Sequence, residues 1–124
     1  AYGARCGVEV LGMSEELGAL MAKRFSEVFF KFDPSVKVLP GADVFFATFG
    51  GTTPIGIVSN KHGSVLRDEI NHFGWQQHIG SVVAFNEASA NKPSPAPALL
   101  ALQQLGIEPG PDIWFVGDTH GDVQ

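Results

Sequence analysis

The residues of this sequence best suited to chemistry are polar and charged side chains that follow short apolar runs. They stand at three points of the chain: Ser59 with Asn60, Lys92, and Asp118 with Asp122. A hydroxyl and turn amides can donate hydrogen bonds to phosphoryl oxygens, and a lysine can neutralise phosphate charge. Magnesium takes one or two protein carboxylates and keeps waters or phosphate oxygens as its other ligands. The residue types therefore predict a site for a phosphate and a divalent cation.

The elements that must position these residues are three predicted strands and the helices between them. Ile55–Val58 is β-branched and bounded by turn residues, and the runs 81–85 and 112–116 are similar. Predicted helices cover 14–32, 42–49, 63–73 and the stretch from Ser94-Pro95 to Gly106. Strands that alternate with such helices indicate an α/β fold with a parallel sheet. Because ligands bind at the carboxyl ends of parallel strands, the three groups of polar residues are expected to meet there.

Each group also has an ordinary structural explanation. Ser59-Asn60 is typical of a turn, and Lys92 before a helix start is typical of a solvated side chain. Gly117-Asp118-Thr119 is typical of a helix cap. The combination, with each group at a strand end, favours the phosphate site. The four histidines share no metal-ligand spacing, so surface or capping roles are expected for His62, His72, His78 and His120.

Composition bounds the fold to a soluble globular domain and excludes several classes of function. The net charge is −5 and the eight basic residues are scattered, which argues against a nucleic-acid partner. No apolar run approaches the ~20 residues that span a bilayer, so no membrane association is expected. No signal-peptide pattern is present at the start of the sequence. Cys6 has no partner for an internal disulfide, which fits a reducing, cytoplasmic location.

Three motifs resemble those of the haloacid dehalogenase superfamily. Ile55–Lys61 resembles its second motif, Asn91–Pro95 its third in the Lys-Pro-x-Pro form, and Val116–Asp122 its fourth, a Gly-Asp-x-x-x-Asp loop. The Ser-Asn-Lys and Gly-Asp-Thr forms are most similar to phosphoglycolate-phosphatase-like members. The resemblance implies a Rossmann-like core with helices on both faces of the sheet. It also implies that residues 1–33 are the tail of a helical cap and that residues 34–124 are part of the core.

The resemblance implies a magnesium-dependent phosphatase that hydrolyses a small phosphorylated metabolite through an aspartyl-phosphate, with phosphoglycolate as the default substrate. The roles it carries over are hydrogen bonds from Ser59 and the Asn60 backbone amide to the phosphoryl oxygens, charge stabilisation by Lys92, and magnesium binding by Asp118 with support from Asp122. The oligomeric state stays open.

One departure from the family is serious, because its first motif, an Asp-x-Asp-Gly-Thr-like run on the first strand, has no match here. The resemblance places that strand between 55–58 and 112–116, so a gap in the sheet is expected. The sequence is therefore expected to be a partial chain, inactive alone, whose nucleophile lies elsewhere. Alternatives are an inactive phosphate-binding or regulatory remnant, a phosphomutase, and an unrelated doubly wound domain. A true dehalogenase is disfavoured because dehalogenases need no magnesium and their metal loop departs from Gly-Asp-Thr.

Overall fold

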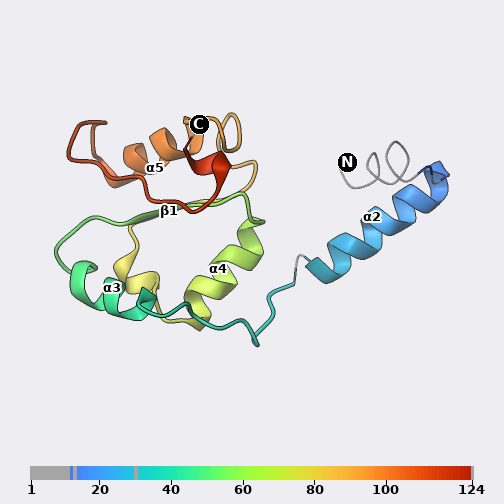
Figure 1. Ribbon diagram of the computed structural model, residues 1–124, viewed down its shortest axis with the longest axis horizontal. Helices are drawn as coiled ribbons and strands as arrows, with labels where there is room; N and C mark the ends of the chain where they lie inside the picture. Colours follow the sequence, from blue (N-terminus) through green and yellow to red (C-terminus); the bar gives the residue numbers. More distant parts are fainter. Residues whose placement is uncertain (1–11, 13, 30, 124) are drawn as a thin grey trace. The chain divides into compact units, whose positions relative to one another are not determined.

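The computed structural model describes residue 12, residues 14–29 and residues 31–123 of the chain (Figure 1). It divides into two compact units, Ala1–Phe32 and Asp33–Gln124. The boundary lies beside the predicted one, while the assignment of the first unit to a cap stays a prediction. Cys6 lies outside the described residues. No described helix is both long and apolar enough to cross a bilayer.

The first unit contains the helix α2, Glu15–Phe29. Its start is the predicted one, because the Ser14 hydroxyl oxygen accepts a hydrogen bond from the Leu17 amide at 3.3 Å. Its end lies three residues before the predicted Phe32. The three- and four-residue spacing of its apolar residues predicts a face buried in a core, but four of the described side chains on it are 46–71% exposed: Leu17, Leu20, Phe25 and Val28. An apolar face is buried only where a second element covers it.

The second unit is built on a parallel pair of strands, β1 (Gly56–Val58) and β2 (Ser81–Val83). Ile57 lies opposite Val82 in the register. Both strands were predicted from the sequence and both are shorter than predicted. The pairing continues past β1, because the Ser59 amide donates to the Val83 carbonyl oxygen at 2.9 Å.

Helices cover both faces of this sheet (Figure 1). On one face lies α5, Ala96–Leu105, where Gly80 leaves room for the Leu105 side chain and the Ser81 hydroxyl donates to Gln104 at 2.6 Å. On the other lies α4, Gly63–His72. Its core cluster joins residues of α4 and both strands: Leu66, Ile70 and Ala84, with Ile57, Trp75, Ile79 and Val82 packed against them. The predicted α/β fold with helices on both sides is confirmed.

The helix α3, Ala42–Phe49, is fixed to the segment that follows α4. The Trp75 indole nitrogen donates to the Asp43 carboxylate at 2.9 Å, and the Phe46 ring lies 4.7 Å from the Trp75 ring between centroids. A short 3₁₀ helix, η1 (Gln76–His78), then leads into β2. These contacts hold α3 beside the sheet on the same side as α4 (Figure 1).

The predicted helix after the third motif is confirmed, with small shifts at its start. It begins at Ala96, whose amide donates to the Ser94 hydroxyl oxygen at 3.2 Å. Its last residue is Leu105, and Gly106, which caps it, adopts a left-handed conformation with φ of 69°. Glycine is favoured at such a position because a Cβ atom disfavours positive φ.

The predicted third strand is wrong, because residues 112–116 form no strand in the described chain. Trp114 is 86% exposed and Val116 is 85% exposed. A strand is defined by hydrogen bonds to a neighbour, and no described segment pairs with this one. After it comes the 3₁₀ helix η2, His120–Asp122.

Candidate active site

The turn after β1 is held by its own backbone and by the end of β2. The Ser59 hydroxyl oxygen accepts a hydrogen bond from the Lys61 amide at 3.1 Å. The Phe85 amide donates to the Lys61 carbonyl oxygen at 3.0 Å. The Lys61 side chain points elsewhere and pairs with Glu69 of α4 at 2.7 Å. Half-buried Ser59 therefore sits in a fixed turn at the carboxyl end of the sheet.

Asn60 joins this turn to the loop that precedes α5. Its Nδ2 donates to the Lys92 carbonyl oxygen at 3.1 Å, and its Oδ1 accepts from the Lys92 amide at 3.1 Å. A second pair stiffens the same loop. Asn91 accepts from the Asn86 amide at 2.7 Å and donates to the Asn86 side chain at 2.8 Å. The second and third motifs are thus in direct contact.

The Lys92 side chain connects the third motif to the fourth. Its Nζ lies 2.5 Å from Oδ1 of Asp122, and the side chains of Lys92 and Asp122 are only 18% and 5% exposed. The other Asp122 oxygen accepts hydrogen bonds from the Thr119 amide at 3.0 Å and the Thr119 hydroxyl at 2.5 Å. The bond to Lys92, followed by those to Thr119, holds the pKa of Asp122 far below its usual range. Asp122 is therefore a carboxylate at any physiological pH.

The fourth motif folds tightly around this carboxylate. A Cβ atom on Gly117 would collide with the Cβ and Cγ atoms of Asp122, so a glycine is required there. Thr119 and Asp122 form a reciprocal capping box on η2. The helix-cap explanation thus applies to these two residues. It does not account for Asp118, whose exposed carboxylate bonds to no described residue.

The two aspartates differ in how far their carboxylates are already bonded. Both oxygens of Asp122 accept hydrogen bonds from Lys92 or Thr119. Asp118 offers one accessible carboxylate, which matches an ion that takes few protein ligands and completes its shell with water or phosphate oxygens. No group of three or more His, Cys, Asp or Glu residues suited to a metal occurs in the described chain. Whether Asp122 contributes to a magnesium site beside Asp118 stays a prediction.

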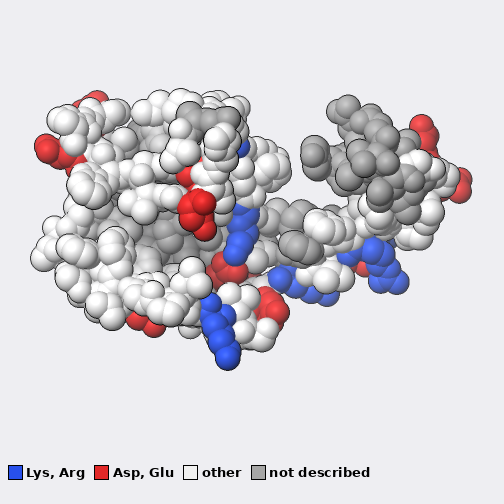
Figure 2. Space-filling model, viewed as in Figure 1, with Lys and Arg blue, Asp and Glu red and all other residues white. Residues whose placement is uncertain are grey.

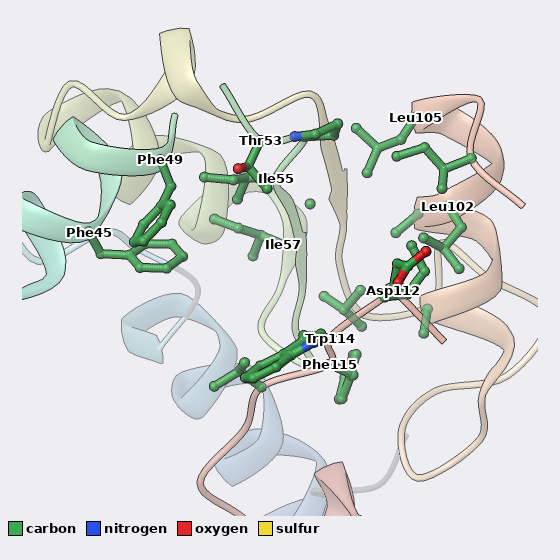
Figure 3. Close-up of a pocket in the computed structure, with 18 of the residues that line it drawn as sticks. Phe45, Phe49, Thr53, Ile55, Ile57, Leu102, Leu105, Asp112, Trp114 and Phe115 are labelled. Carbon is green, nitrogen blue, oxygen red and sulfur yellow. The ribbon is translucent and has the colours of Figure 1, made fainter. Parts of the chain in front are cut away.

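A groove of about 580 Å³ lies between β1 and residues 112–116. Figure 3 shows Ile55 and Ile57 along it, Phe45 and Phe49 of α3 at one side, and Leu102 and Leu105 of α5 at the other. Trp114 and Phe115 form the wall across from β1. The groove occupies the gap expected from the absent first motif. No local sequence signal marks its lining, because α3, β1 and α5 come from distant parts of the chain.

Some of the charged side chains outside the site form ion pairs. Arg67 pairs with Glu87 at 2.8 Å, and Lys61 pairs with Glu69. The hydrogen bond from Arg67, together with one from the Ala84 amide, lowers the pKa of Glu87. On the face shown in Figure 2, Lys and Arg lie among Asp and Glu. The absence of a nucleic-acid partner stays a prediction.

Sequence reasoning missed the side-chain role of Asn60 and the part played by Thr119. The sequence suggested a backbone role for Asn60, whereas its side chain binds Lys92. The sequence predicted no separate role for Thr119, whose amide and hydroxyl bind Asp122. The Asn60 contact joins loops 32 residues apart, which no local pattern encodes. The three-residue spacing of Thr119 and Asp122 is that of a capping box, so this signal was present in the sequence.

Known proteins resemble most of this chain, including the residues of the candidate site. The family model for haloacid dehalogenase-like hydrolases matches residues 9–124. Phosphoglycolate phosphatase of Escherichia coli (strain K12) is 29% identical over 83 residues, which cover 67% of this chain and 32% of that protein. N-acetylmuramic acid 6-phosphate phosphatase of Pseudomonas aeruginosa is 32% identical over 69 residues, covering 56% and 30%. The chain spans about a third of the length of these curated relatives.

A solved structure extends the likeness to three dimensions. The crystal structure of a HAD-superfamily hydrolase from Ehrlichia chaffeensis superposes with a TM-score of 0.73 at 30% sequence identity. The match covers 94% of this chain and 57% of that one. The arrangement of helices around the parallel strand pair is therefore that of a larger solved fold.

Proposed function

Since this chain belongs to the family of haloacid dehalogenase-like hydrolases, we propose that its full-length protein is a magnesium-dependent phosphatase acting on a small phosphomonoester. The observation that carries the proposal is the continuous series of contacts from Asn60 to Lys92 and from Lys92 to Asp122. It gathers a hydroxyl turn, an ammonium group and a carboxylate loop at one end of the sheet. The two relatives named for their substrates are both phosphatases of small phosphorylated compounds.

The proposed roles follow from the chemistry of each group. The Ser59 hydroxyl and the amides of its turn would donate hydrogen bonds to the phosphoryl oxygens. The Lys92 ammonium would neutralise charge on the transferring phosphoryl group, an effect commonly worth several kcal/mol. Asp122 would hold that ammonium in place, because it already binds Lys92 and is itself fixed by Thr119.

The nucleophile would come from a strand in the groove beside β1. Both walls of the groove lead into the site, since Val58 precedes Ser59 and Val116 precedes Gly117-Asp118. A strand parallel to β1 would therefore deliver the residue that follows it to the same end. An aspartate there would bond to phosphorus as the P–O bond to the leaving alcohol breaks, with a second acidic residue protonating that alcohol. Water would then hydrolyse the aspartyl-phosphate.

Asp118 is the residue proposed to hold magnesium, with its remaining ligands from water, the phosphate and residues outside this sequence. When bound, the ion would supply positive charge that stabilises negative charge developing on the phosphoryl oxygens. Asp122 is proposed as a support for Lys92 and the loop, because its own oxygens are engaged.

Phosphoglycolate is the proposed substrate by resemblance to the Escherichia coli relative. The relatives differ in the compounds they are named for, so the chemistry common to them is phosphomonoester hydrolysis. The second candidate function is a phosphate-binding or regulatory protein without turnover. It is favoured by one observation, that no Asp-x-Asp run occurs in residues 1–124. A phosphomutase is a further possibility within the family.

The test compares residues 1–124 alone with the full-length protein, using an aryl phosphate and phosphoglycolate with and without magnesium. The chain alone is expected to be inactive, because the proposed nucleophile lies outside this sequence and must stand in line with phosphorus, about 3–3.5 Å away. The full-length protein is expected to turn over and to lose activity with a chelator. An active chain of residues 1–124 would contradict the placement of the nucleophile, and an inactive full-length protein would favour the binding function.

A further inference from the structure

The Asn60 side chain makes both backbone hydrogen bonds found for Lys92. Its Oδ1 accepts from the Lys92 amide and its Nδ2 donates to the Lys92 carbonyl oxygen, each at 3.1 Å. No backbone group of the described chain pairs with Lys92. Lys92 lies outside the helices and strands, so this one side chain replaces the pairing that a regular element would provide.

The neighbouring contacts leave the Lys92 backbone dependent on Asn60. Asn91 is held by Asn86, which fixes the loop on one side of Lys92. At the far end of the side chain, Lys92 Nζ binds Asp122. Between these anchors, within the described part of the chain, the Asn60 side chain makes the hydrogen bonds that hold the backbone from which the four-carbon side chain extends. A small rotation there would move the ammonium group by much more than it moves the backbone.

We propose that the Asn60 side chain is a positioning residue for Lys92 and takes no part in binding the phosphate. The inference rests on the proposed phosphatase function. It follows from the geometry, because the two polar atoms of the Asn60 side chain both face the Lys92 backbone. Asn60 then affects the reaction rate only through the Lys92 ammonium group. Removing the Asn60 side chain should therefore lower the rate only when Lys92 is present.

A double-mutant cycle in the full-length protein tests this dependence. Asn60→Ala is expected to lower kcat about tenfold with little change in KM, since misplacement of a catalytic group is costly in rate. In the Lys92→Met background the same substitution is expected to change kcat less than about twofold, because coupled residues are non-additive. Asn71→Ala, an exposed asparagine of α4, is the matched control and is expected to leave kcat unchanged.

Amide exchange of Lys92 gives a measurement that does not depend on catalysis. The Lys92 amide is expected to exchange faster in Asn60→Ala and at the wild-type rate in Asn71→Ala, with urea unfolding checking that each variant is folded. An unchanged Lys92 exchange rate would overturn the pairing. Faster exchange combined with independent, multiplying effects of Asn60→Ala and Lys92→Met on kcat would overturn the positioning role. If the wild type hydrolyses no phosphomonoester, the proposed function fails, and the exchange result alone decides whether Asn60 positions Lys92.

Discussion

Substitution of Gly117 by alanine probes the packing of the fourth motif most directly. The added methyl group would collide with the Cβ and Cγ atoms of Asp122, which is held on its other sides by Lys92 and Thr119. The atoms in the way are at the base of the Asp122 side chain, so either that side chain or the loop must shift. Gly110 offers the matched control, because an alanine methyl group there would meet nothing within 4 Å.

The size of the effect follows from this overlap. Ordinary contact for a Cβ atom begins near 3.4 Å, so Asp122 or the loop must move by roughly 1 Å. A displacement of about 1 Å at a catalytic group can cost ~10²-fold in rate. Overpacking typically lowers the free energy of unfolding by ~1–3 kcal/mol. Gly117→Ala is therefore expected to reduce kcat/KM about a hundredfold and to lower the free energy of unfolding, while Gly110→Ala changes kcat/KM less than about twofold.

The assay is steady-state hydrolysis of an aryl phosphate by the full-length protein, with urea unfolding of the same samples. If Gly117→Ala behaved like Gly110→Ala in both measurements, the close approach of Asp122 to Gly117 would be wrong. If only stability fell, the loop would be packed as described but Asp122 would not matter for turnover.

Three further outcomes are expected in the full-length protein. Lys92→Met should lower kcat ~10²–10³-fold, as removal of a group that stabilises transition-state charge does, whereas the same change at exposed Lys37 should have no effect on kcat. Asp118→Asn should weaken the magnesium dependence and the activity together, and an unchanged magnesium midpoint in a titration would refute its role. Glu87→Gln should lower the free energy of unfolding by less than ~1 kcal/mol at pH 7, because its pair with Arg67 is partly exposed. Because Arg67 lowers the Glu87 pKa below its ordinary value of 4.5, the pair stabilises the fold above that pH and loses its effect as the pH falls below it. The difference in unfolding free energy between wild type and Glu87→Gln, measured by urea unfolding, should therefore vanish at low pH.

Most of the second unit follows from local sequence signals. The periodicity of α3 and α4 and the Gly106 stop of α5 are properties of neighbouring residues, so those helices lie within two residues of their predicted bounds. The strands β1 and β2 follow from two short apolar runs that also happen to pair with each other.

The two wrong predictions, the third strand and the buried face of α2, have the same cause. Both structures depend on contacts with segments that are distant in the sequence or not among the described residues. Residues 112–116 have the composition of a strand, but pairing is a property of two segments and this one has no described neighbour to pair with. The stripe of α2 is amphipathic, yet burial needs a covering element. In both cases the residue composition permits a strand or a buried helix face, but that structure forms only where a second segment pairs with it or packs against it.

For the candidate site too, the sequence predicted which residues matter but not how their side chains are arranged. The motifs predicted that Ser59, Lys92 and Asp118 matter, because these residue types suit phosphate and magnesium. They did not predict that the Asp122 carboxylate is enclosed by Lys92 and Thr119, since that requires two loops to meet. The structure therefore adds a contact that the motifs did not predict, in which Asp122 supports the Lys92 ammonium group.

The groove links completion of the sheet to completion of the proposed active site. Its lining is largely apolar, and its β1 wall has no strand partner on that side among the described residues. An extended apolar segment entering it would pair with β1, cover Trp114 and Phe115, and give residues 112–116 the neighbour that a strand requires. The same event would bring the end of that segment beside Ser59 and Asp118. Completion of the sheet and completion of the proposed active site would then be one step, so stability and catalysis should be gained together.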